Sequence, residues 1–403
     1  MSRPHAYRSL RRADPVSRRE FVRAASACTA VAGGIVLGVP GCTTPLTRPK
    51  TNIDDFMRAP RGKHALPGAF PGKVVEVHDR QSLVDGQYDD KVVAEMFERG
   101  VQALTGRDMR GSFALFFEPS DVVGIKVNPV GSPLISTRVE LAQIVVGWLI
   151  ANGIPASNII IWDRFDYMLR DAGFTPDRFP AGVGLEGLQT MDERGNAWRD
   201  KSGRHVSIDN FDQDVYYFVK GLAGRAPGEF RSEEQYLNQN VFNGEYSYYG
   251  KLLTQRVTKL VNLSTFKSTG HGVSIATKNL GYGAVCNTSR LHEPLFFDVN
   301  VEVLAAPVIR DKLVLNVTDA IRGQYDDGPY LNAQFVYDKH SLFFATDPFA
   351  LDMLCHRQLV AKRKEMGISV NEHPRFTEYL RYAERLGLGV TTPGKVKHVK
   401  VGA

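Results

Sequence analysis

Six short runs of apolar residues, separated by segments of helix length, constrain most what this chain of 403 residues can fold into. Several of the runs are continuous rather than alternating, which is typical of strands covered on both faces. The apolar runs cover 73–78, 121–127, 158–162, 257–263, 313–317 and 342–345, and the helix-like segments cover 91–104, 139–152 and 348–364. This alternation predicts an α/β fold, a mainly parallel sheet with crossover helices.

Residues 185–256 interrupt the alternation. They are rich in Gly, Asp, Asn, Tyr and Arg and contain few long apolar runs. We expect them to form an irregular, loop-rich insertion in an α/β domain that spans 71–370. The remaining segment, 371–403, predicts a C-terminal helix followed by a basic tail.

The first 41 residues have the parts of an export signal. Arg18 and Arg19 form a twin arginine, and the chain carries no charge from Ala24 to Thr47. This pattern resembles a Tat signal, so we expect export through the Tat translocon to the periplasm. Such a route often serves proteins that acquire a cofactor before export, although the pattern names none.

Residues 39–42 resemble a lipoprotein box that ends at Cys42. Two alternatives stay open: lipidation of Cys42, with 42–70 as a tether, or simple cleavage, with 42–70 as a linker. The apolar run of the signal is short for a spanning helix. A lipid anchor is therefore the one membrane attachment that we expect.

The charge of the chain argues against a nucleic-acid partner. The formal net charge is +6, but residues 1–41 hold seven arginines against one aspartate and one glutamate, a net +5. The remainder carries +1, which is too little for non-specific binding to phosphates.

Two cysteines lie in the body of the chain, Cys286 and Cys355. Two thiolates cannot hold an iron–sulfur cluster of four cysteines, so the chain has no iron–sulfur motif. They either form a disulfide or remain two separate buried thiols.

Polar residues follow one very apolar strand. Lys126 and Asn128 end the run 121–127 and, at a spacing of two, lie on the same face. Open α/β sheets bind ligands beyond the carboxyl ends of their strands. These two residues therefore indicate a site for an anionic or carbonyl group, unless Lys126 extends to solvent and Asn128 starts a turn.

A second polar group follows the run 257–263. Gly270 and Gly281 can bracket a short helix over 271–280, which places His271 and Lys278 two turns apart on one face, with Asn279 at its edge and Lys267 just upstream. A free N-terminal turn of this helix would add backbone donors for an anion. Among these residues His271 is the best general acid or base, because its ordinary pKa lies near neutral pH.

A third group is acidic. Asp319 ends the run near 313–317, and Asp347 precedes the helix-like segment that starts at Pro348. These carboxylates would hold the lysines, orient His271 or bind a divalent cation with it. Asp347 also fits the N-cap of that helix.

At these constellations the chain resembles DUF362, a family of bacterial and archaeal proteins of unknown function. The matching pieces are 121–128, 161–164, Lys267 with His271, 278–281, Asp319 followed by 328–329, and 347–352. The family's Lys-Thr-His is stretched here to Lys-Ser-Thr-Gly-His, and the clustered cysteines of some relatives are missing. The resemblance implies no particular reaction.

Two functions remain. In the first, the chain is an enzyme for a small anion (a carboxylate, a phosphate or an acidic sugar), with His271, Lys278 and Lys267 in catalysis. Lys126, Asn128 and Asn279 would bind the substrate, and Asp319 and Asp347 would orient these groups or hold a metal. In the second, a periplasmic or lipid-anchored protein binds a small anion or metal complex, or assists maturation, without turnover.

A third interpretation makes the same side chains internal ion pairs. No nucleotide, dinucleotide or zincin motif supports a different chemistry.

Overall fold

The chain separates into two units, Met1–Thr47 and Arg48–Ala403, and the fold described here is that of the second. The computed structural model describes residues 48–403 apart from 191–197, 200, 203–205, 223–243, 271, 293–294, 296, 371–372 and 403. Arg18, Arg19, Cys42 and His271 therefore lie outside the described residues.

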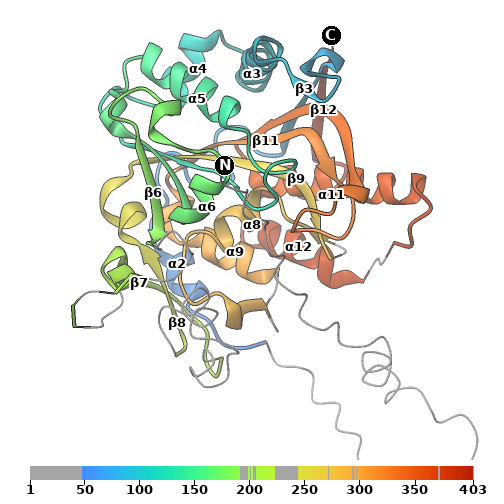
Figure 1. Cartoon of the computed structure of the whole chain (residues 1–403). Helices are drawn as coiled ribbons and strands as arrows, with labels where there is room; N and C mark the ends of the chain where they lie inside the picture. The colour runs from blue at the N-terminus through green and yellow to red at the C-terminus, as the bar shows by residue number, and fades with distance from the viewer. Residues whose placement is uncertain are drawn as a thin grey trace, which may run out of the picture. The chain divides into compact units, whose positions relative to one another are not determined.

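A large mixed sheet forms the centre of this unit (Figure 1). Across it the strands are ordered β13 (Lys397–Gly402), β1 (Lys73–His78), β12 (Val336–Ala345), β11 (Leu313–Gln324), β9 (Lys259–Thr269), β4 (Val123–Lys126), β5 (Ile159–Phe165) and β6 (Gly184–Gln189). Of these eight strands, β12 alone runs antiparallel to its neighbours. The short β10 (Gly272–Val273) pairs antiparallel with β9.

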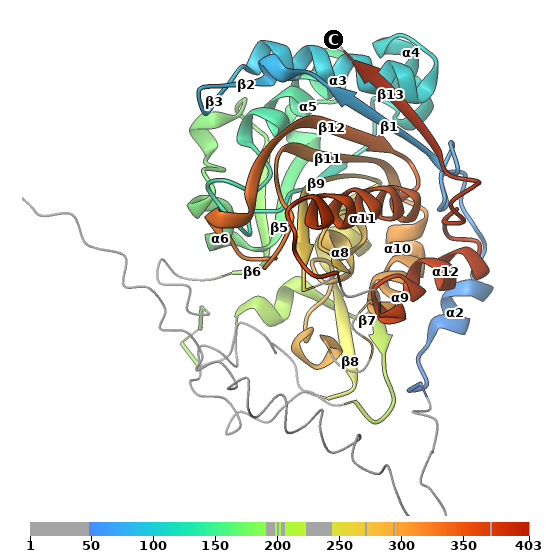
Figure 2. The ribbon, with the colours of Figure 1, turned by 90° about the vertical axis from the view of Figure 1, so that its right-hand side faces the viewer.

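Helices cover both faces of the sheet. The described helices are α2 (Ile53–Arg58), α3 (Asp90–Thr105), α4 (Met109–Phe116), α5 (Val139–Ala151), α6 (Asp166–Asp171), α8 (Ala276–Gly281), α9 (Asp298–Ala305), α10 (Pro307–Arg310), α11 (Pro348–Glu365) and α12 (Glu378–Arg385). In Figure 2 the strands from β13 to β9 form an arc, with α3, α4 and α5 outside it and α8 and α11 inside it.

The two faces build two separate cores, as β9 shows. Its Leu260 and Phe266 pack with residues of α8, α9 and α11, whereas Val261 and Leu263 pack with residues of α3, α4 and α5. Because both faces of the strand are buried, apolar side chains stabilise the fold at successive positions and not only at alternate ones. The predicted α/β fold with a mainly parallel sheet is therefore confirmed.

Local sequence signals set the helix ends. Asp89 caps α3 by accepting from the N–H groups of Lys91 and Val92, and Gly106 ends it in a left-handed conformation (φ 73°). Asp347 caps α11, with Pro348 as its first residue. These are the termini that charged caps, proline and glycine favour.

The described part of the expected insertion contains both a sheet strand and a separate ribbon. β6 extends the main sheet, while β7 (Phe211–Phe218) and β8 (Tyr246–Gly250) pair with each other. A second small ribbon, β2 (Leu83–Val84) with β3 (Gln87–Tyr88), precedes α3. In the C-terminal segment the basic tail contributes β13, which pairs in parallel with β1. The loop-rich character of 185–256 stays a prediction.

Cys286 and Cys355 are both buried and free, so the separate thiols and not the disulfide describe the folded unit. Among the described helices, none combines the length and the apolar character needed to span a bilayer.

A candidate anion site at the carboxyl edge of the parallel strands

Lys126 ends β4 and is only 1% exposed. Its ammonium donates to three acceptors: the Asp163 carboxylate on the neighbouring β5, the Asn279 side chain (2.9 Å) and the carbonyl of Val127 (2.7 Å). Burial lowers the pKa of Lys126, and Asp163 opposes that shift. Three acceptors, one of them charged, match the three N–H donors of an ammonium, so Lys126 is a fully satisfied cation.

The Lys126 ammonium is also fixed by a relay of side-chain amides. Asn279 accepts from Lys126 and donates to Asn262 (2.8 Å), which donates to Asn316 (2.9 Å), which donates to the carbonyls of Ala345 and Thr346 (3.3 Å each). An ammonium can only donate and a carbonyl can only accept, so the orientation of every amide in between is determined. The relay thereby links Lys126 to α8, β9, β11 and β12.

Lys267, near the end of β9, has a different environment. It is fully buried, and its Nζ donates to Asn128 Oδ1 (3.0 Å) and to the carbonyl of Val130, both neutral acceptors. Burial, reinforced by Lys278 and Lys126 and opposed by Asp163, lowers its pKa to about 7. A pKa this low makes the uncharged amine accessible to Lys267 at neutral pH.

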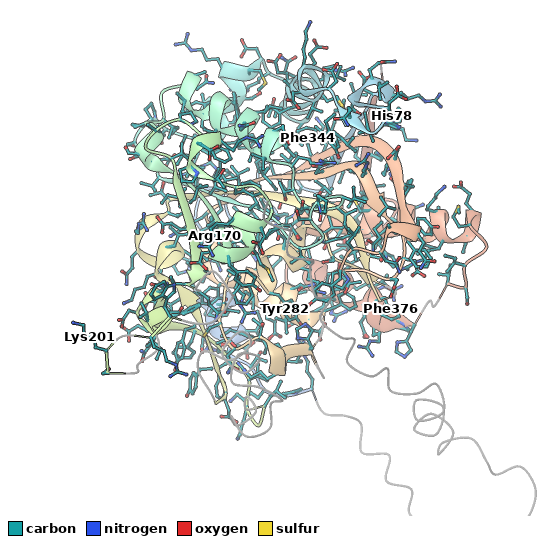
Figure 3. The ribbon with its side chains drawn as sticks, viewed as in Figure 1. His78, Arg170, Lys201, Tyr282, Phe344 and Phe376 are labelled. Atoms are coloured by element: carbon teal, nitrogen blue, oxygen red, sulfur yellow. The ribbon has the colours of Figure 1, made fainter. Side chains whose placement is uncertain are left out.

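Lys278 lies on α8 and is partly exposed. Its Nζ donates to Thr269 at the end of β9 (2.9 Å) and lies 5.8 Å from the ring centre of Tyr282, which is labelled in Figure 3. Burial lowers the pKa of Lys278 to about 8. Two direct contacts thus join predicted site residues, Lys126 with Asn279 and Lys267 with Asn128, and the charges of Lys126 and Lys278 both act on Lys267.

The route by which Lys278 arrives differs from our expectation. The helix begins at Ala276 and not at His271, because Gly272 and Val273 form β10 and pair back onto β9. The predicted face shared by His271 and Lys278 over two helical turns is therefore wrong.

The predicted free N-terminal turn of this helix is also wrong. Asp352 occupies it by accepting from the N–H groups of Ala276 (2.9 Å) and Thr277 (3.3 Å) and from the Thr277 hydroxyl. Tyr379 donates to the same carboxylate (3.2 Å).

A glycine lets α8 approach Lys126. A Cβ at Gly283 would lie 2.3 Å from the carbonyl oxygen of Asn279 and 2.5 Å from Cε of Lys126. Both distances are shorter than real Cβ contacts, so a side chain here would displace Lys126 or the end of α8.

A second glycine restrains the end of β9 at Ser268. Gly328 donates to Ser268 Oγ (3.1 Å), and a Cβ on it would lie 2.1 Å from the carbonyl oxygen of Ser268. Arg363 donates to the carbonyl of Gly270 (2.8 Å). The turn between β9 and β10 is thus held from two sides, directly beyond Lys267.

The two predicted carboxylates lie elsewhere. Asp319 shares the face of β11 with Val317 and Ile321, which pack with α5, whereas Asn316 of the relay faces the other way. Its carboxylate accepts from the N–H groups of Arg138 (3.3 Å) and Ile321 (3.2 Å), and burial raises its pKa to about 6. The sheet therefore separates Asp319 from the relay face to which Lys126 belongs.

Asp347 is engaged as a structural cap. Its carboxylate accepts four backbone N–H groups, those of Gly72, Phe349, Ala350 and Val390, at 2.8–3.1 Å. Burial raises its pKa to about 7. Asp347 therefore fills the alternative role that we gave it, the N-cap of α11, and it makes no ion pair with a lysine among the described residues.

Asp163 takes the place that was expected for these two carboxylates. It follows Trp162 on β5, and the Trp162 ring centre lies 5.4 Å from the Lys126 ammonium. The neighbouring Arg164 is partly buried, and desolvation lowers its pKa to about 10. In the sequence, Asp163 and Arg164 directly follow the apolar run 158–162. A charged residue at the end of an apolar run is also the feature that indicated Lys126.

No group of three or more His, Cys, Asp and Glu side chains suited to a metal ion occurs among the residues that the structure describes. The polar atoms of the cluster are ammonium, amide and one carboxylate, a set that fits an anion better than a cation. The fold and this cluster define an α/β protein with a buried, lysine-rich centre at the carboxyl edge of its parallel strands.

Residues 232–357 match the model of a family described as a domain of unknown function (DUF362). The matched segment contains Lys267, Lys278 and Asn279, and it supports the family resemblance for that part of the chain. No curated protein and no solved structure matches the chain.

Proposed function

We propose that the chain is an exported enzyme that binds a small organic anion at the lysine cluster and transfers a proton on it. One observation carries this proposal: Lys267 is buried beside two other lysines, and its hydrogen-bond partners are neutral. An anion would relieve the repulsion among these cations, and an amine with a pKa near 7 suits proton transfer at neutral pH.

The residues divide into three roles. Lys126, whose donors are all used within the protein, contributes positive charge without touching the ligand. Lys278, which is partly exposed, pairs with the anionic group of the ligand. Lys267 takes or gives the proton.

Asn128 supplies a directional contact. Its Oδ1 accepts from Lys267, and its side chain is 6% exposed, so Nδ2 can donate to a ligand oxygen. We retain His271 as a candidate general acid or base, because it lies four residues after Lys267 in the sequence.

Anion binding is the first test. We expect saturable heat on titration with oxalate, glucuronate or inorganic phosphate, and a weaker affinity in Lys278→Met and Asn128→Ala. Lys91→Met, which removes an exposed lysine on α3, should bind as the wild type does. If none of the three anions binds, or if Lys91→Met matters as much as Lys278→Met, the lysine cluster is not an anion site.

Proton transfer is the second test. A panel of small carboxylates, 2-oxo acids and hexuronates is incubated with the protein in D2O, and exchange of C–H for C–D is followed by NMR. Lys267→Arg keeps a cation but cannot become a neutral base, so it should retain binding and lose exchange. Binding by the wild type without exchange or conversion of any compound would favour the non-catalytic binding protein.

Export is part of the proposal and is tested separately. Replacing both Arg18 and Arg19 with lysine should leave the protein in the cytoplasm. If Cys42 is lipidated, Cys42→Ser should move the exported protein from the membrane fraction to the soluble periplasmic fraction. Unchanged fractionation of both variants would remove the Tat and lipoprotein assignments.

A further inference from the structure

Lys126 and Lys267 lie in the same buried cluster but offer different numbers of hydrogen-bond acceptors. Lys126 meets three acceptors, including a carboxylate, which is the set that an ammonium needs. Lys267 meets two, both neutral, among the residues that the structure describes. A neutral amine has two N–H donors and one lone pair, so two acceptors satisfy it completely and leave the lone pair unused.

From this difference we propose that Lys267 is an imine-forming nucleophile and that the ligand is a small 2-oxo acid. This inference rests on the proposed anion site and deepens it. A buried ammonium with a third N–H unsatisfied would be costly, whereas the neutral amine fits its surroundings without loss. Neighbouring cations favour the same neutral form, because they repel an ammonium.

The surroundings of Lys267 select the substrate class. Asn128, which holds the Lys267 amine through Oδ1, can present Nδ2 to a carbonyl oxygen beside it. Lys278, which is partly exposed and lowers the pKa of Lys267, offers a cation to a carboxylate. A carbonyl next to a carboxylate is the arrangement of a 2-oxo acid, and the carbonyl carbon would then lie toward Nζ of Lys267.

The step balances without a redox partner. The lone pair of Lys267 Nζ forms a C–N bond with the carbonyl carbon, the C=O π electrons move to oxygen, and one Nζ proton is transferred to that oxygen. The resulting carbinolamine loses its hydroxyl group with the second proton as water. The products are an imine and one water molecule, formed from one amine and one carbonyl.

Reductive trapping tests the inference on the intact wild-type protein. The protein is incubated with pyruvate and sodium cyanoborohydride, and the sites of modification are mapped by peptide mass spectrometry. Each modified lysine gains the mass of pyruvate plus two hydrogens minus one water. We expect Lys267 to be the most heavily modified lysine.

Burial sharpens this test. Non-specific modification should follow exposure, so exposed Lys91 would react first and fully buried Lys267 last. Preferential modification of Lys267 in the folded protein, lost after unfolding in urea, therefore requires an activated amine. If the extent of modification follows the solvent exposure of the lysines, the inference is overturned. The test uses the wild-type protein alone and does not depend on the folding of a variant.

Two further outcomes separate this inference from the proposed function. If oxalate binds but pyruvate forms no adduct at Lys267, the imine is wrong and the anion site stands. If neither oxalate binding nor an adduct is found, both fail. In Lys278→Met, we expect an adduct at Lys267 that forms at least several-fold more slowly at low pyruvate concentration and recovers when pyruvate is raised.

Discussion

Replacing Lys267 with methionine should change how the stability of the protein depends on pH. The pKa of Lys267 falls from an ordinary 10.5 to about 7 in the folded state, a shift worth about 5 kcal/mol. Below pH 7 both the folded and the unfolded chain hold the proton, and the fold bears that full cost. Between pH 7 and 10.5 the unfolded chain binds more protons than the folded one, so the cost decreases as pH rises, by up to about 1.4 kcal/mol per pH unit.

Methionine carries no proton, so Lys267→Met removes this dependence. At pH 7 the wild type still bears a cost of about 4 kcal/mol from the buried ammonium, and at pH 9 about 2 kcal/mol. The variant leaves Asn128 Oδ1 and the Val130 carbonyl without a donor, which costs about 1–3 kcal/mol for each group at any pH. The net stability at pH 7 therefore depends on two opposing effects, but the difference between variant and wild type should fall by about 2 kcal/mol from pH 7 to pH 9.

Equilibrium unfolding in urea, followed by tryptophan fluorescence at intervals between pH 7 and 9, measures this difference. Comparing variant with wild type cancels the groups that titrate in the range without interacting with Lys267; Lys278, which lowers the pKa of Lys267, contributes to the measured difference through this coupling. Exposed Lys91→Met should run parallel to the wild type. Parallel curves for Lys267→Met as well would mean that Lys267 has an ordinary pKa, and the reasoning about a neutral amine would be refuted.

Three other substitutions test the support around this amine. Lys126→Met leaves the Asp163 carboxylate buried without its cation and should lower the free energy of unfolding by about 3–5 kcal/mol, and a second change, Asp163→Leu, should restore most of it in urea titrations. Gly283→Ala places a methyl group against Cε of Lys126 and should weaken oxalate binding in calorimetry while costing about 1–3 kcal/mol. Asp352→Ala uncaps α8 and should lower the midpoint of thermal unfolding and weaken oxalate binding together, with a cost of about 2 kcal/mol or more because the released N–H groups are buried.

The strands of this fold could be predicted because a strand that is buried on both faces has a continuous run of apolar residues in the sequence. The runs 121–127 and 257–263 contain β4 and much of β9, and their residues are divided between two cores. Such a run needs no knowledge of its partners to be recognised. The order of the strands and the antiparallel direction of β12 depend on pairings between distant segments, which apolar periodicity does not specify.

The sequence shows which polar residues end apolar strands, but the face on which each of them lies decides which can meet. Lys126 and Asp319 both follow such strands, but Asp319 lies three residues after Asn316 and therefore on the opposite face of β11. Residues two apart on a strand share a face, as we expect for Lys126 and Asn128, whereas the spacing of three between Asn316 and Asp319 places them on opposite faces. Asn262 and Asn316 were a further signal, because each interrupts an apolar run with a residue that a strand buried on both faces must satisfy.

The short helix α8 could not have been placed from local sequence. A helix over 271–280 agrees with local spacing, but Gly272 and Val273 instead form backbone pairs with Thr269 and Ser268 of β9. The six residues of α8 are too few to be stable alone, and its first turn depends on Asp352, which lies 76 residues beyond Ala276. Lys278 and Asn279 thus reach the cluster through a contact between distant segments.

The amide relay explains why two lysines in one cluster can hold different charges. The orientation of Asn279 is fixed, because its Oδ1 accepts from Lys126 and its Nδ2 donates to Asn262, whose own partners are fixed as far as the Ala345 carbonyl. Asp163 is likewise engaged by Lys126. Among the described residues these acceptors bond Lys126 and not Lys267, and the positive charge of Lys126 adds to the cost of protonating Lys267. On this argument the relay favours the neutral form of Lys267 by holding the Lys126 ammonium in place, and a change at Asn262 would alter the pKa of Lys267 without contact between the two side chains.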